Sequence, residues 1–139
     1  MPDSTQPRPD AATIRGQFQA WNSGDYEGWM GEAHPEIEYT PGIIVGPAGG
    51  ERVVYRGHDE LRRFFEEWHS QWRMEFTVGE IEPAGDWILI LGRARLTGVQ
   101  SGATVEQDVG LIAQYEDGLL RRFRSCPSHQ AARDAVEAS

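Results

Sequence analysis

The stretch WNSGDYEGW, residues 21–29, decides the fold together with HPEIEYTPG, residues 34–42. It predicts a first helix that ends in the Ser23-Gly24 turn and a second helix that begins behind Asp25, a residue type that caps helix N-termini. Pro35 is expected to end the second helix, and the alternating residues after it predict a short strand. Two helices and a strand at the start of a chain of 139 residues indicate a small α+β domain whose helices cover one curved sheet.

The rest of the chain supplies the other elements. Apolar residues at helical spacing predict helices over 11–22 and 57–72 and a short closing helix over 130–136. Apolar runs between turn residues predict strands over 36–40, 73–82, 87–97, 104–115 and 119–126. Because no helix separates the later strands, the sheet is expected to be antiparallel. Glycine and proline between 41 and 57 predict a loop, with a short strand at 52–55 and a flap at 46–50.

The composition limits the kinds of partner and chemistry that the protein can have. A chain of this length forms one domain, expected over 11–139 behind a disordered segment at 1–10. The net charge of −9 argues against nucleic acid and anionic membranes as main partners, because both need a basic face. All 13 basic residues are arginines, so Schiff-base chemistry and lysine-linked pyridoxal phosphate are excluded.

Cysteine, histidine and arginine add further limits. Cys126 is the single cysteine and allows no internal disulfide, and the N-terminus lacks an apolar signal core, so the cytoplasm is the expected compartment. The four histidines are scattered without metal-ligand spacing, and neither a metal nor a cofactor is expected. A local basic patch either holds a carboxylate or faces solvent and salt bridges; its arginines are at 93, 95, 121, 122 and 124.

Four segments resemble a known family: residues 21–25, 34–39, 55–61 with the Phe64-Phe65 pair, and 116–123. Their order and junctions resemble the nuclear transport factor 2-like superfamily, and within it the SnoaL-like polyketide cyclase group. The resemblance implies a cone-like half barrel wrapped over three helices, a ligand cavity inside, and a homodimer through the outer sheet face. The family includes isomerases, cyclases, dehydratases, epoxide hydrolases and non-catalytic binding domains, so its fold does not define an activity.

The resemblance to the steroid-type isomerases can be followed by position. Their general base falls near Thr40, their oxyanion-donating tyrosine near Gln17, and their protonated aspartate near Leu111. Threonine does not abstract a carbon-bound proton unaided, and leucine donates no hydrogen bond to an oxyanion. Ketosteroid isomerisation by that mechanism is therefore not expected.

Two residues are the leading candidates for proton transfer. Glu38 has the strand parity of Thr40, so it either projects into the cavity, where burial would raise its pKa, or lies solvated at a wet strand edge. His69 follows Phe65 by one turn on the flank of the third helix's apolar stripe. Its imidazole suits proton transfer near neutral pH, unless it is a histidine of the helix surface.

Asp108 is the reserve candidate. With Glu106 it forms a carboxylate pair on one strand face, and Arg93 or Arg95 on the neighbouring strand could complete a charged triad such as the epoxide-hydrolase members use. The alternative is that this face is the outside of the sheet. The approximate register favours that alternative, because it turns the residues at 107, 109, 111, 113 and 115 inward.

The sequence therefore predicts a small-molecule pocket protein. A cofactor-free acid/base enzyme of the cyclase, isomerase or dehydratase type, acting on an apolar or polycyclic metabolite, is the first hypothesis, and a non-catalytic ligand-binding or dimerisation domain is the alternative. Gln17, Thr40 and Tyr115 are expected to orient polar ligand groups. The expected apolar wall consists of Trp21, Phe65, Trp68, Trp72 and Phe123.

Overall fold

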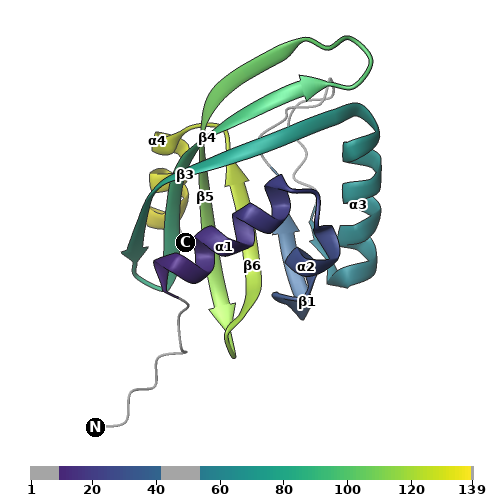
Figure 1. Ribbon diagram of the computed structural model, residues 1–139. Coiled ribbons are helices and arrows are strands. Elements are labelled where there is room, and N and C mark those ends of the chain that lie inside the picture. The colour runs from purple at the N-terminus through teal and green to yellow at the C-terminus, as the bar shows by residue number, and fades with distance from the viewer. Residues whose placement is uncertain (1–9, 42–53, 139) are drawn as a thin grey trace, which may run out of the picture.

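The computed structural model describes residues 10–41 and 54–138. They form one curved six-stranded sheet with three helices on its inner side and a fourth on its outer side (Figure 1). In sheet order the strands are β2 (Tyr55–Arg56), β1 (Ala33–Thr40), β6 (Leu119–Cys126), β5 (Thr104–Glu116), β4 (Trp87–Gly98) and β3 (Trp72–Ala84). The helices are α1 (Ala11–Asn22), α2 (Tyr26–Met30), α3 (Gly57–Gln71) and α4 (His129–Glu137).

The predicted α+β architecture is confirmed, and so are most element positions. The helices expected over 11–22, 57–72 and 130–136 correspond to α1, α3 and α4. Asp25 caps α2 as predicted, because its Oδ1 accepts a hydrogen bond from the Gly28 N–H at 3.0 Å. The β-hairpin turn between β5 and β6 has Asp117 and Gly118 in the left-handed region, the conformation that such tight turns require.

The second helix is shorter than predicted, and Pro35 does not end it. α2 stops at Met30, and β1 begins at Ala33 with Pro35 inside it. The pairing of β1 with β6 is irregular between Ala33 and Glu38, so the proline, which has no N–H to donate, lies where the ladder is already interrupted.

One pair of strands departs from the antiparallel prediction. β1 and β6 run parallel, whereas the other neighbouring pairs are antiparallel. A hairpin forces two strands to be antiparallel, but α3 and four strands separate β1 from β6 along the chain. The pattern of consecutive hairpins therefore carried no information on this one pairing.

α1 covers the free edge of β3 with side-chain hydrogen bonds. The Asn22 Nδ2 donates to the Phe76 carbonyl at 2.9 Å, and the Phe76 N–H donates to the Asn22 Oδ1 at 2.8 Å. The Arg15 guanidinium donates to the carbonyls of Val78 and Gly79, at 3.1 and 2.8 Å. These bonds occupy backbone groups that an edge strand would otherwise leave unpaired, and they fix α1 across the open side of the sheet.

Apolar clusters lie on both sides of the sheet. The larger one, between the sheet and helices α1 to α3, is the interior of the cone and contains most of the aromatic residues. The smaller one lies under α4 on the outer face and consists of Leu89, Leu91, Ile112, Cys126, Ala132 and Ala135. Gly110 allows α4 to approach the sheet, because a Cβ at this position would overlap the Ala132 methyl group. The homodimer expected through the outer face stays a prediction, and α4 already covers the apolar part of that face.

Some predictions fall on residues 1–9 and 42–53, which lie outside the described parts. These are the disordered N-terminal segment, the flap at 46–50, and all but two residues of the strand expected at 52–55. Where the chain is described again, the strand observed is Tyr55–Arg56. Among the described helices, none combines the length and the apolar character needed to cross a membrane.

Candidate functional site

The interior of the cone contains a small apolar cavity of about 30 Å³. Its wall comes from α1, α2 and α3 on one side and from the inner face of the sheet on the other. The lining residues are Phe18, Trp21, Trp29, Tyr39, Phe65, Met74, Phe76, Leu111, Phe123 and Ser125. Of the predicted wall residues, Trp21, Phe65 and Phe123 therefore lie where the sequence analysis expected them. A cavity of this size holds about two water molecules.

Trp21 stands at the centre of the aromatic packing. Its ring lies 4.8 Å from Phe65, 5.3 Å from His69 and 5.4 Å from Tyr26, measured between centroids. The tilted and edge-on arrangements are those that aromatic rings prefer, and each contributes about 0.5–1.5 kcal/mol beyond the burial of area. These contacts hold the indole between α2 and α3, with its face and edge both enclosed.

Polar atoms without a partner surround this packing. Within the described residues, the buried Trp21 Nε1, His69 Nε2 and Gln17 Nε2 have no hydrogen-bond partner. Buried polar atoms are nearly always paired, and leaving one unpaired costs about 1–3 kcal/mol. Such atoms commonly indicate a bound water or ligand group that the protein alone does not supply.

His69 carries a buried acceptor beside the rings of Trp21 and Phe65. Its Nδ1 lies 2.7 Å from the Phe65 carbonyl, which only accepts, so Nδ1 carries the proton and Nε2 keeps its lone pair. The ring stacks on Tyr26 at 4.1 Å, and burial lowers the pKa of His69. Near neutral pH the imidazole is therefore uncharged and able to accept a proton at Nε2.

Two buried tyrosines provide the other polar groups of the interior. The Tyr39 hydroxyl lies 3.3 Å from the Ser125 Oγ, and burial raises the pKa of Tyr39 to about 12. The Tyr115 hydroxyl donates to the Gln17 Oε1 at 3.0 Å, and burial raises its pKa as well. Gln17 and Tyr115, both expected to orient polar groups of a ligand, thus bond to each other, and neither lines the cavity.

Glu38 does not point into the cone, so of the two alternatives left open by the sequence, the one away from the cavity holds. Ile37 and Tyr39 on either side of it belong to the interior cluster, and alternation along β1 turns Glu38 to the outer face. There it pairs with Arg121 at 3.1 Å and Arg56 at 3.3 Å. Glu38 is therefore not placed to act as a base on a ligand in the cone.

Three predicted binding residues lie outside the cavity for related reasons. Thr40 has the same parity as Glu38 and lines a groove on the outer face. Trp68 and Trp72 are half-buried and continue a row of stacked rings from Phe64, with centroids 6.1 and 6.3 Å apart. This row runs along α3 into β3, beside the cavity wall rather than in it.

The predicted orientation of β5 is confirmed. Val109, Leu111, Ala113 and Tyr115 belong to the interior cluster, whereas Glu106 and Asp108 are exposed on the outer face. The Arg93 Nη1 donates to the Asp108 Oδ1 at 3.0 Å, and the Arg93 Nε lies 3.8 Å from the Glu106 Oε1. The charged triad therefore exists, but it lies on the side of the sheet opposite the cone.

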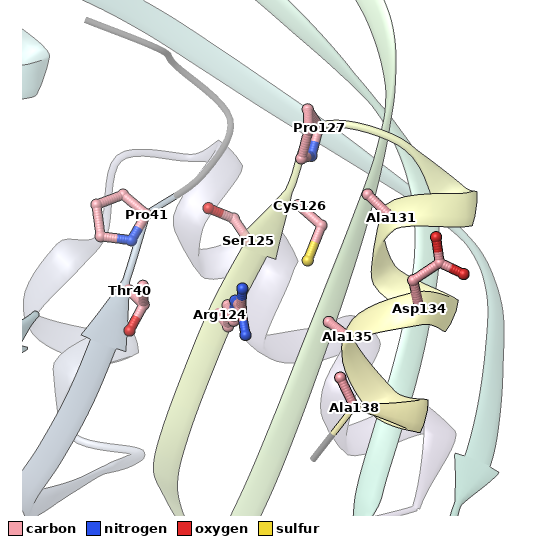
Figure 2. Close-up of a pocket in the computed structure, with 10 residues that line it drawn as sticks. All are labelled: Thr40, Pro41, Arg124, Ser125, Cys126, Pro127, Ala131, Asp134, Ala135 and Ala138. Atoms are coloured by element: carbon pink, nitrogen blue, oxygen red, sulfur yellow. The ribbon is translucent and has the colours of Figure 1, made fainter. Parts of the chain in front are cut away.

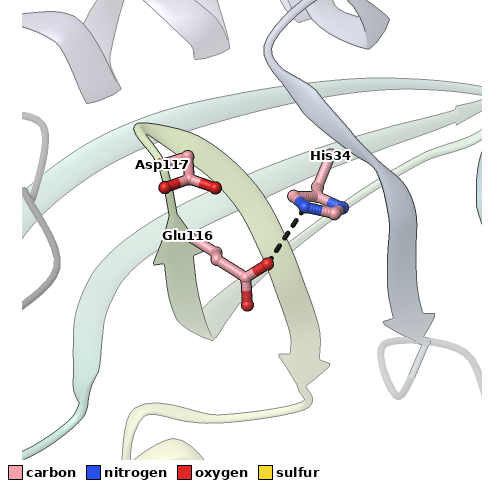
Figure 3. Close-up of side chains that lie close together, drawn as sticks. All are labelled: His34, Glu116 and Asp117. Atoms are coloured by element: carbon pink, nitrogen blue, oxygen red, sulfur yellow. Dashed lines mark ion pairs between the residues drawn. The ribbon is translucent and has the colours of Figure 1, made fainter.

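One cluster in the described residues has the geometry of metal ligands, formed by His34, Glu116 and Asp117 (Figure 3). The hydrogen bonds of its imidazole argue against a metal. The Glu36 N–H donates to the His34 Nδ1 at 3.0 Å, so Nε2 carries the proton and donates to the Glu116 Oε2 at 3.1 Å. A ligating histidine normally donates its second N–H to an acceptor, whereas here the second nitrogen faces a donor.

Much of the cavity wall was not predicted from the sequence. The lining residues that were not singled out are Phe18, Trp29, Tyr39, Met74, Phe76 and Ser125. Strand parity was the available signal, because Tyr39 shares the inward face with Ile37, and Met74 shares it with Phe76. The sequence alone did not show that these strands bend around the same space.

The fold and the enclosed aromatic cavity define a cone-shaped α+β domain of the nuclear transport factor 2-like class. The family model of the SnoaL-like domain matches residues 14–123, and the chain belongs to this family. No curated protein matches the chain.

Solved structures support the same fold. An NTF2-like protein of unknown function from Burkholderia pseudomallei is 22% identical, with a TM-score of 0.72, over 91% of this chain and 93% of that chain. TerC, co-crystallised with polyporic acid, is 20% identical with a TM-score of 0.70, over 89% and 95%. A Mesorhizobium loti protein provisionally assigned as a SnoaL-like polyketide cyclase is 18% identical with a TM-score of 0.62, over 84% and 98%. At these identities the likeness shows the fold alone.

Proposed function

We propose that this protein binds a small apolar molecule in the interior of the cone. The observation that carries the proposal is the set of buried, unpartnered polar atoms around an apolar cavity, above all the Trp21 Nε1 donor and the His69 Nε2 acceptor. A ligand acceptor in the cavity would satisfy the Trp21 Nε1, and a ligand donor would satisfy the His69 Nε2 where the ligand reaches past the rings of Trp21 and Phe65. Ring-shaped molecules suit the wall best, because aromatic rings contribute most of its residues.

The size of the cavity limits how such a ligand can bind. An apolar cavity of about 150 Å³ is needed to hold benzene, whereas the interior measures about 30 Å³. A ring therefore enters only if wall side chains move. Met74 is suited to such movement, because its unbranched side chain adapts to irregular space and it is only half-buried.

His69 determines the chemistry that such a site could perform. A neutral imidazole with an open lone pair can remove a proton next to a carbonyl and return it elsewhere, without metal or cofactor. Cyclisation, isomerisation and dehydration of an apolar metabolite all need a step of this kind. TerC, a neighbour with the same fold, was co-crystallised with a small molecule, polyporic acid.

A non-catalytic binding domain is the second candidate. Among the described residues that line the cavity, the only ionisable side chain is that of Tyr39, and burial holds it protonated at neutral pH. No carboxylate takes part in the wall, and His69 reaches the interior only from behind Trp21 and Phe65. This arrangement favours binding without turnover.

Calorimetric titration with 1-naphthol, which carries a donor and an acceptor on two fused rings, tests the binding proposal. Removing the indole N–H in Trp21→Phe should weaken binding about tenfold, the effect of one hydrogen bond of about 1.4 kcal/mol. Trp87→Phe is the matched control, because Trp87 packs against the outer cluster. Equal affinities of wild type and Trp21→Phe, or no binding by either, would contradict the proposal.

Deuterium exchange separates the enzyme from the carrier. In D2O, an active base should exchange the protons next to the carbonyl of 2-tetralone, and proton NMR follows their loss. His69→Gln should abolish the exchange and keep the affinity for 2-tetralone within about twofold, because the amide keeps a polar group but is no base. A wild type that binds 2-tetralone without exchanging these protons identifies the non-catalytic domain.

A further inference from the structure

A second hollow lies on the outer face of the sheet. It is a groove of about 510 Å³ with β6 as its floor, α4 along one side and the end of β1 along the other (Figure 2). Arg124 lies on the floor, Thr40 on the β1 side, and Ala135 and Ala138 on the helix side. Ser125 lines both this groove and the interior cavity, so the two hollows lie back to back across β6. The volume lies within the range of about 300–1,000 Å³ that is typical of small-molecule sites.

Positive charge accumulates beside this groove. Glu38 is the single carboxylate shared by Arg56, Arg121 and Arg122, at 3.3, 3.1 and 4.0 Å. Arg124 lies two residues further along β6, beside Thr40, and no carboxylate of residues 10–41 and 54–138 lies within 4.0 Å of its guanidinium. These four guanidinium groups outnumber the two carboxylates of this region, Glu38 and Asp134, in a chain whose net charge is −9.

The two sides of the groove differ from its floor. The helix side consists of small apolar side chains, Ala131, Ala135 and Ala138, and Pro41 stands opposite them. Asp134 is the only acid of the described lining; it is exposed, and its Oδ1 accepts from the Gln130 Nε2 at 2.9 Å. The groove thus combines apolar sides with a half-buried cation that has no ion-pair partner among the described residues.

We propose that this outer groove is a second binding site, which takes a small carboxylate with an apolar ring. Its carboxylate pairs with Arg124, whose planar guanidinium can donate two parallel hydrogen bonds to one carboxylate. The ring lies against the alanines of α4. Thr40 lines the same groove, and its hydroxyl can form a further hydrogen bond with the carboxylate. The site stands on residues of the outer face alone, and it is independent of what the cone interior binds.

Titration with 2-naphthoate and with 2-naphthamide tests the site. The two probes share the ring, and only the first carries a charge. We expect wild type to bind the carboxylate about tenfold more tightly than the amide, because a charge-assisted pair is about twice as strong as a neutral hydrogen bond. Arg124→Gln should remove this preference, Arg124→Lys should keep part of it, and added salt should reduce it.

Arg95→Gln is the matched control. Arg95 is exposed on the same outer face and lies outside the groove, so this variant should keep the wild-type preference. In ¹H–¹⁵N spectra, 2-naphthoate should shift the amide signals of Cys126, Ala135 and Ala138. Thermal unfolding confirms that each variant is folded.

Three results would overturn the proposal. The first is equal affinity for the two probes in wild type. The second is an Arg124→Gln variant that is folded and still prefers the carboxylate. The third is a set of shifts confined to the residues of the cone interior, or spread over a subunit interface with no dependence on Arg124.

Discussion

Asn22 shows how much one side chain contributes to this fold. Its amide both donates to and accepts from the backbone of Phe76, so it acts as a short piece of strand on the free edge of β3. Asn22→Ala removes both hydrogen bonds and should lower the free energy of unfolding by about 1–3 kcal/mol. Asn22→Asp keeps the acceptor, so its free energy of unfolding should lie between those of wild type and Asn22→Ala. Urea unfolding measures this free energy for all three proteins. A loss below about 0.5 kcal/mol, the range of ordinary surface substitutions, would show that water replaces the amide.

His69 should make stability depend on pH. Burial lowers its pKa below the ordinary 6.5, so the unfolded chain binds a proton more readily than the folded protein. The free energy of unfolding is therefore complete above about pH 6.5 and falls as the pH drops below that value. In His69→Gln, the decrease between about pH 7.5 and about pH 5.5 should be less steep than in wild type.

Urea unfolding at several pH values in this range measures how steeply the free energy of unfolding changes with pH. His129→Gln is the control, because His129 is also half-buried and bonded to a backbone carbonyl, Gly92 at 2.8 Å, but lies on the outer face. Identical slopes for wild type and His69→Gln would contradict the prediction.

At the same scale, the sequence predicted residues on helices better than residues on strands. Trp21 and Phe65 follow from a periodicity that fixes the face of a helix over several turns. Glu38 and Thr40 stand on a short strand, where an error of one residue moves every side chain to the other face. The alternation along β1 placed Glu38 and Thr40 on one face, but it did not show which face turns inward, and both residues lie on the outer face.

At the scale of elements, the contact of α4 with β5 depends on Gly110. An added Cβ would overlap the Ala132 methyl group and lie 3.0 Å from the Ser128 carbonyl oxygen, and neither can move without the helix. Gly110→Ala should therefore lower the free energy of unfolding by about 1–3 kcal/mol, the usual cost of overpacking. Thermal or urea unfolding measures the loss.

Gly16→Ala is the opposite case and serves as the matched control. Gly16 is exposed in α1, and a Cβ there meets nothing within 4 Å. Alanine is the better helix former, so this variant should gain about 0.5–1 kcal/mol. If both alanines had the same effect, the close approach of α4 to Gly110 would not be the cause.

The elements themselves were largely predictable, and their arrangement was not. Hairpin turns such as the one after Glu116 fix the order and direction of β3 to β6, because consecutive strands with short links pair with each other. The parallel contact of β1 with β6 joins strands that lie far apart along the chain. It extends the sheet by β1 and β2 beside β6, and no local sequence pattern indicates it.

At the scale of the whole molecule, the sheet is apolar on both faces, and α4 is what covers the outer one. Leu89, Leu91 and Ile112 are at most 5% exposed because this helix packs on them. The remaining outer face is charged, with Arg93, Glu106 and Asp108 paired across β4 and β5. The expected homodimer through this face would thus have to rest on paired charges or on a displaced α4.

Removing α4 tests whether this helix keeps the apolar outer face from associating with another copy. A chain that ends at Ser128 exposes the outer cluster, and exposed contiguous apolar surface on a sheet drives association. Light scattering after size exclusion should show a mass that rises with concentration and exceeds that of the full chain by at least about twofold. Adding Leu91→Ser and Ile112→Thr to the shortened chain should reverse the rise, because both side chains belong to the cluster. If the shortened chain kept the mass of the full chain at every concentration, α4 would not be what separates this outer face from a partner.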